Sequence, residues 1–200
     1  MDLLERLKPY CDALVEGMKS ENWYLSLMAA FTLPDICNSL EGKRGRMPYV
    51  KWFNKYVKQY QVTIYRGEND QVTTLPNGGT ITGRKKSSTP MEPTHTFLTG
   101  VIAYALRSAF LHNGGGEVEK EDIYTDFAKK PNNEEFLLGI KKVKFLANPT
   151  NLATEQIDST ILLNPKIYCQ AILEGVDKWI IDKEHNRKVL NNTKKLIIFE

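Results

Sequence analysis

The 200 residues of the chain are 42% hydrophobic and 26% charged, and no long Pro/Ser-rich linker divides them, so we expect one well-buried core and a single domain over residues 1–200. The longest nearly apolar stretch, Phe97 to Leu106, is about half of the ~20 residues that a membrane span needs, so we expect no membrane contact. The net charge of +3 is too small to indicate a partner, and the three widely spaced cysteines, without a Cys-x-x-Cys pair, favour a cytoplasmic protein over a disulfide scaffold or a zinc site.

The N-terminal part of the sequence predicts three helices. Residues 2–19 repeat apolar side chains at helical spacing, and residues 22–40 are apolar almost all round. Pro34 should kink or restart the second helix, with Thr32 available as a local cap. Residues 47–60 predict a shorter third helix with its lysines outward. These segments favour a helical core that extends over about residues 2–112.

Residues 61–93 differ from the segments around them because they are rich in Thr, Gly, Pro and Asn. Two segments with strand-like composition, 61–66 and 71–75, flank the polar run Gly67-Glu68-Asn69-Asp70. This pattern is typical of a β-hairpin or an excursion loop. We therefore expect residues 61–93 to form a basic loop or hairpin inserted into the helical core.

The sequence from residue 96 onward predicts a fourth helix and then a mixed α/β part over about residues 113–200. The fourth helix should run from Thr96 to His112, because the glycines from Gly114 to Gly116 stop it. Beyond it we expect strands within 137–146 and 159–164, a helix over 165–182 and a terminal strand over 194–200. The predicted fold class is therefore mainly α, a helical bundle around the second and fourth helices with a small appended β element in the C-terminal half.

Basic residues are concentrated between Lys43 and Lys86, where ten Lys or Arg stand against only Glu68 and Asp70. Aromatic residues are interleaved with them, a combination that suits binding of a polyanion such as RNA. The predicted RNA-binding residues are Lys43, Arg44, Arg46, Lys51, Arg84, Lys85 and Lys86. The alternative interpretation is that these side chains are only solvated, on the outer face of a helix and in a loop.

Four polar side chains interrupt the apolar fourth helix. At helical spacing Tyr104, Arg107, Ser108 and His112 fall within an arc of about 140°. An unpaired buried arginine costs several kcal/mol, and Asp35 is the only acid in the second helical segment that could pair with it. Three interpretations remain open. Arg107 and Asp35 form an ion pair that tethers two helices while His112 caps the end of its helix; or His112 exchanges protons while Arg107 holds a phosphate for catalysis; or the same two residues bind a nucleotide or phosphorylated ligand without turnover.

The segment from Leu106 to Gly114, LRSAFLHNG, resembles the motif of the HEPN superfamily, in which an Arg is followed after four to six residues by a His at the end of a core helix. Four residues separate Arg107 from His112, and Ser108 stands where the family usually has Asn, Asp or His. The resemblance implies an all-helical homodimer with a composite, metal-independent ribonuclease site and no cofactor. Many such proteins act in defence or toxin-antitoxin systems, so an antitoxin is an implied partner.

The resemblance also implies a mechanism, in which an RNA 2′-hydroxyl attacks the adjacent phosphate and leaves a 2′,3′-cyclic phosphate and a 5′-hydroxyl. His112 would act as general base or acid, and Arg107 would stabilise the pentacovalent phosphorane. Ser108 or Tyr104 would orient phosphate oxygens. The alternatives are a non-catalytic HEPN-like module that binds RNA or another ligand, or a structural or interaction protein of a phage or mobile element.

Overall fold

The computed structural model describes residues 2–57, 60–62, 70–74, 80–84, 95–96, 98–119, 141–146, 154–157 and 160–196. The chain divides into two compact units. Residues 1–58 and 165–200 form the first, which we call the helical unit, and residues 59–164 form the second, which we call the mixed unit. That the two units make one domain stays a prediction.

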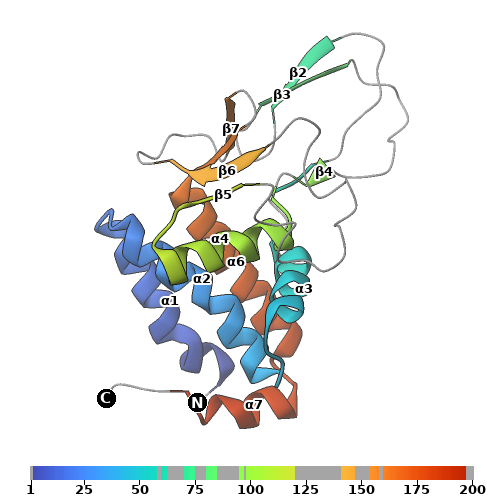
Figure 1. Ribbon diagram of the computed structural model, residues 1–200. Coiled ribbons are helices and arrows are strands. Elements are labelled where there is room, and N and C mark those ends of the chain that lie inside the picture. The colour runs from blue at the N-terminus through green and yellow to red at the C-terminus, as the bar shows by residue number, and fades with distance from the viewer. Residues whose placement is uncertain are drawn as a thin grey trace. The chain divides into compact units, whose positions relative to one another are not determined.

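The helical unit consists of helices from both ends of the chain (Figure 1). They are α1 (Leu3–Lys19), α2 (Trp23–Leu40), α3 (Arg46–Tyr56), α6 (Pro165–Lys183) and α7 (Arg187–Thr193). Helix α2 packs against each of the other four, most extensively against α1 and α6. The apolar character of α2 on nearly all sides follows from this central position, because a helix that is covered all round has no solvent-facing stripe.

The starts of α1 and α2 are fixed by side-chain caps. The Asp2 carboxylate accepts a hydrogen bond from the Glu5 backbone N–H at 2.7 Å, and the Glu5 carboxylate accepts one from the Asp2 N–H at 2.8 Å. This reciprocal capping box satisfies donors that the first helical turn leaves open. At α2, the Asn22 side chain accepts from the Leu25 N–H at 3.1 Å.

An aromatic cluster fills the core where α2, α3 and α6 meet. The Tyr168 ring lies with its centroid 5.4 Å from that of Phe31 on α2 and 6.3 Å from that of Phe53 on α3. All three side chains are fully buried. Each removes a large apolar surface from water, so this cluster holds the C-terminal helix α6 to the two N-terminal helices.

In its described residues, the mixed unit combines one helix with short strands. Helix α4 (Gly100–Asn113) packs against β5 (Glu117–Glu119). The largest sheet has the order β5-β6-β8-β7, with β6 (Lys142–Phe145) parallel to β8 (Thr160–Leu163), and β7 (Thr154–Ile157) antiparallel to β8. Two antiparallel pairs precede α4: β1 (Gln61–Val62) with β4 (His95–Thr96), and β2 (Asp70–Thr74) with β3 (Thr80–Arg84).

The predicted fold class is confirmed, because the described chain is mainly helical with a small β element in the C-terminal half. A hairpin is present within residues 61–93, but its strands are 70–74 and 80–84, whereas the sequence paired 61–66 with 71–75. Helix α2 continues through Pro34, so it does not restart there, and the kink that was the alternative expectation stays a prediction. Packing of the second helix on the fourth stays a prediction, because α2 and α4 belong to different units.

The C-terminal segment differs from its prediction. Residues 187–193, for which no element was predicted, form helix α7, and turns follow at 194–195 where a terminal strand was expected to begin. The rest of that predicted strand, residues 197–200, lies outside the described residues. In the described part of the chain, no helix is both long enough and apolar enough to cross a membrane.

Candidate functional site

Both ends of α4 are defined by local hydrogen bonds. At the start, the Thr99 hydroxyl accepts from the Ile102 N–H at 3.3 Å. At the end, Gly114 adopts a left-handed conformation with a φ of 68° and donates to the Phe110 carbonyl at 3.0 Å, while Gly115 donates to the Ala109 carbonyl at 3.1 Å. A residue with a side chain is strained in this conformation, so Gly114 ends the helix directly after its last turn. That turn contains His112.

The four polar residues of α4 lie on the less buried side of the helix. Tyr104, Arg107 and Ser108 are half-buried and His112 is exposed, whereas Leu106 and Phe110 on the opposite side are buried. The Arg107 guanidinium lies over the Tyr104 ring, with Cζ 5.5 Å from the ring centroid. Such a cation–π contact contributes roughly 0.5–1 kcal/mol and restricts the arginine side chain. The predicted arginine and histidine therefore lie on the same, less buried side of one helix.

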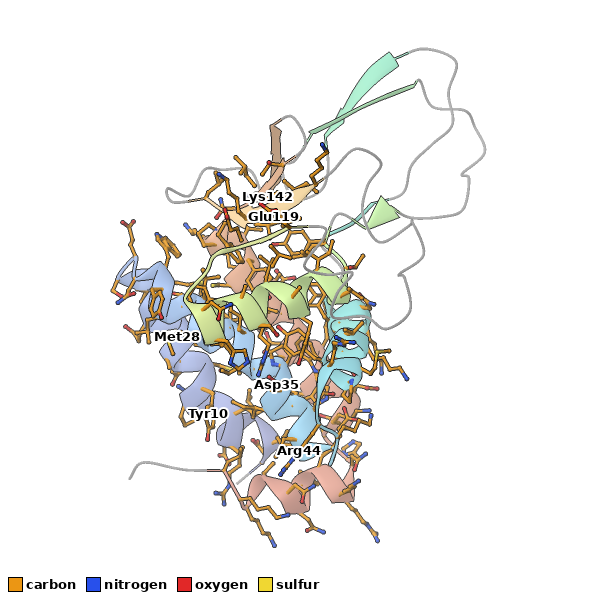
Figure 2. All side chains as sticks on the ribbon, viewed as in Figure 1. Tyr10, Met28, Asp35, Arg44, Glu119 and Lys142 are labelled. Atoms are coloured by element: carbon orange, nitrogen blue, oxygen red, sulfur yellow. The ribbon has the colours of Figure 1, made fainter. Side chains whose placement is uncertain are left out.

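Asp35, the predicted partner of Arg107, is half-buried on α2 (Figure 2). It belongs to the helical unit, whereas Arg107 belongs to the mixed unit. An ion pair between them would join the two units, and it stays a prediction.

The predicted RNA-binding residues fall into two groups. Lys43, Arg44 and Arg46 lie in and next to the connection between α2 and α3, and Lys51 follows one turn later on α3. All but the half-buried Arg46 are exposed. Arg44 is labelled in Figure 2. Arg84 ends strand β3, but its side chain and the residues Lys85 and Lys86 lie outside the described part of the chain. The structure thus brings four of the seven together within the helical unit.

A further group of charged residues was missed by the sequence reasoning. The Asp182 carboxylate on α6 accepts hydrogen bonds from the Lys55 ammonium at 2.8 Å and from the Tyr56 hydroxyl, and it lies 3.0 Å from the Lys183 ammonium. The hydrogen bonds from Lys55, Tyr56 and Lys183 hold the pKa of Asp182 well below its ordinary value. Burial and the bond to Asp182 raise the pKa of Tyr56 to about 12. No local pattern could indicate this group, because residues far apart in sequence form it.

Within the described residues, no group of three or more His, Cys, Asp or Glu side chains is placed to hold a metal ion. Comparisons of the chain with family models, with curated proteins and with solved structures find no match. The functional interpretation therefore depends on the residues and their geometry.

Proposed function

We propose that the chain is a HEPN-like, metal-independent endoribonuclease of a defence or toxin-antitoxin system. The observation that supports it best is the placement of Arg107 and His112 on the less buried side of one helix, with His112 exposed in the last turn. A group that transfers protons and a cation that stabilises the phosphorane both promote cleavage of RNA through its own 2′-hydroxyl.

In this proposal the residues of α4 divide the chemistry between them. His112 removes the proton of the 2′-hydroxyl or donates one to the leaving 5′-oxygen, because histidine exchanges protons near neutral pH. The Arg107 guanidinium, restrained by its contact with the Tyr104 ring, stabilises the negative charge that develops on the phosphorane. Ser108, half-buried beside Arg107, and the Tyr104 hydroxyl orient the phosphate oxygens.

The proposed site is composite and belongs to a homodimer. The reaction needs one group that accepts a proton and another that donates one. The stripe of polar residues on α4 contains one histidine, His112. A second copy of the chain would supply the second histidine and a second arginine, so the active species in this proposal is a homodimer.

The reaction has a specific product signature that tests the proposal. Purified protein incubated with RNA in EDTA should give fragments that end in 2′,3′-cyclic phosphates and begin with 5′-hydroxyls. Fragments with 3′-hydroxyl and 5′-phosphate ends, or cleavage that EDTA abolishes, would contradict the proposal because they indicate metal-assisted attack by water.

A second candidate function, RNA binding without cleavage, is favoured by the exposed cations Lys43, Arg44 and Lys51. Cations that contact phosphates supply affinity that falls with salt and carry no sequence preference. In that case, replacing Arg44 and Lys51 by Gln should weaken RNA binding and reduce its salt dependence, while neither the wild type nor the variant cleaves RNA. The two functions are distinguished by whether cleavage products form at all.

A further inference from the structure

The helical unit contains a cleft of about 410 Å³ that no sequence pattern predicted. It lies where the C-terminal ends of α2 and α6 meet α3, so all of its lining residues belong to one unit. Ligand pockets in proteins range from ~300 to ~1,000 Å³, so the cleft can hold a small molecule. Its lining includes four lysines: Lys43, Lys51, Lys55 and Lys183.

The charges in the cleft do not cancel. Glu41 pairs with one of the four lysines, and Asp182 pairs with two others at 2.8 and 3.0 Å. Lys51 is exposed and makes no ion pair with a carboxylate among the described residues. Four ammonium groups thus face two carboxylates, and the cleft carries an excess of two positive charges.

Trp52 provides a second, independent observation. Its side chain lines the cleft and is only 3% exposed, yet its indole Nε1–H has no hydrogen-bond partner among the described residues. A buried donor without a partner costs ~1–3 kcal/mol. The six-membered ring is fixed against Gly175 on α6, where an added Cβ would lie 3.0 Å from Trp52 Cη2. Nε1 is on the five-membered ring, at the other end of the indole.

We propose that this cleft binds a phosphomonoester, with the Trp52 Nε1–H donating to a phosphate oxygen and the Lys51 ammonium as its principal counter-ion. A phosphomonoester carries about −1.5 to −2 charges at neutral pH, which matches the charge excess better than a carboxylate or a phosphodiester with one charge. The organic part of the ligand lies on the apolar side of the cleft, formed by Met47 and Pro48. This inference depends only on the helical unit and is independent of the cleavage proposed for α4.

The Trp52 indole signal gives a direct test on the wild-type protein. The chain has three tryptophans, so a two-dimensional ¹H–¹⁵N spectrum should contain three indole N–H signals. Adding inorganic phosphate or AMP should shift one of these signals, and the spectrum of Trp52→Phe should lack that same signal. Adenosine, which lacks the phosphate, should leave the chemical shift of the signal unchanged. If saturating AMP shifts no indole signal, or shifts only that of Trp23 or Trp179, the proposal is wrong.

Affinities measured by calorimetry with AMP separate the two contacts. Trp52→Phe removes the donor and keeps an aromatic ring, and should weaken binding roughly tenfold, since a hydrogen bond to a charged group contributes ~1.5–3 kcal/mol. Lys51→Gln should weaken binding about fivefold at low salt and less at high salt. Trp23→Phe and Lys178→Gln are matched controls outside the cleft and should bind like the wild type. Equal affinities for all four variants would overturn the proposal.

Two sources of a phosphomonoester are a free nucleotide and the end of an RNA strand. Short RNAs that differ only in a 5′-phosphate or a 5′-hydroxyl distinguish them. If the 5′-phosphorylated RNA shifts the Trp52 signal at a lower concentration than AMP does, the ligand is the end of an RNA strand. If AMP shifts the signal at the lower concentration, the ligand is a free nucleotide. A response to the 5′-hydroxyl RNA as strong as to the phosphorylated one would contradict recognition of a monoester.

Discussion

At the scale of single residues, Gly17 is the glycine of the helical unit at which an added Cβ would meet the nearest neighbouring atom. It lies on the face of α1 that packs against α2, and a Cβ there would be 2.7 Å from Ser26 Oγ and 3.3 Å from the Ser26 nitrogen. We expect Gly17→Ala to lower the free energy of unfolding by about 1–3 kcal/mol, measured by denaturant titration, because one helix must move or one side chain must leave its rotamer.

The cause of that loss can be isolated with a double-mutant cycle. Ser26→Ala removes the Oγ atom that the new methyl group would meet, so the loss on Gly17→Ala should be smaller in a Ser26→Ala background. If the stability losses of the two single variants simply add in the double variant, the close contact between the new methyl group and Ser26 does not cause the loss on Gly17→Ala. The packing described for α1 and α2 is then wrong.

The candidate site residues on α4 were easier to find from the sequence than their surroundings. Arg107 and His112 stand out because polar side chains are rare on an apolar helix, and the structure places both on its less buried side. The contact of Arg107 with Tyr104 follows from their i, i+3 spacing on that helix. By contrast, no sequence pattern indicates an indole N–H without a hydrogen-bond partner, so Trp52 was not predicted as part of a site.

At the scale of elements, Asp182 joins α6 to α3 through its bonds from Lys55 and Tyr56. These bonds and the nearby Lys183 lower its pKa in the folded protein, so its stabilisation is complete above the ordinary value of 3.8 and is lost as the pH falls from that value to the lower pKa of the folded state. The carboxylate is 39% exposed and solvent screens it, so we expect a contribution of about 1 kcal/mol or less.

The pH dependence of unfolding measures this contribution. The free energy of unfolding of the wild type should decrease below about pH 4 more steeply than that of Asp182→Asn. Asp177→Asn removes an exposed carboxylate from the same helix and is the matched control. If the Asp182→Asn and wild-type curves are parallel in acid, the three donors do not stabilise the ionised carboxylate.

Element boundaries show what sequence alone could and could not predict. The end of α4 was predicted closely because glycine in a left-handed conformation is a strong stop signal, and the observed end is Asn113. Its start was placed too early, at Thr96, because Thr96 and Thr99 are equally good caps by residue type. In the structure Thr96 belongs to strand β4, and the Thr99 hydroxyl accepts from the Ile102 N–H. The hairpin partner was misassigned because several β-prone segments compete within residues 61–93.

At the scale of the whole molecule, sequence patterns could not predict which helices pack together in the helical unit. The Trp179 indole on α6 donates to Glu41 at 2.8 Å, and the Asn192 amide on α7 donates to the Leu40 carbonyl at 2.8 Å. Both contacts join the end of α2 to a segment more than a hundred residues later. Periodicity reports a helix and its apolar face, but not which distant helix covers that face.

The proposed homodimer makes a prediction at the same scale. If each active site needs α4 from two copies, the cleavage rate per protomer should fall when the protein is diluted below its dissociation constant, as measured by sedimentation. A rate per protomer that stays constant while the sedimentation coefficient falls to that of a monomer would exclude a composite site.

The most direct test of the ribonuclease proposal compares RNA cleavage in EDTA by the wild type, His112→Ala and His185→Ala. Both histidines are exposed, so both variants should keep the wild-type circular dichroism spectrum, and His185 lies outside α4. We expect the wild type and His185→Ala to give fragments with cyclic-phosphate ends and His112→Ala to lose at least ~100-fold in rate, the lower end of the contribution of a general acid or base. Equal rates for a folded His112→Ala and the wild type, or no cleavage by any of the three across a broad RNA panel, would contradict the proposal.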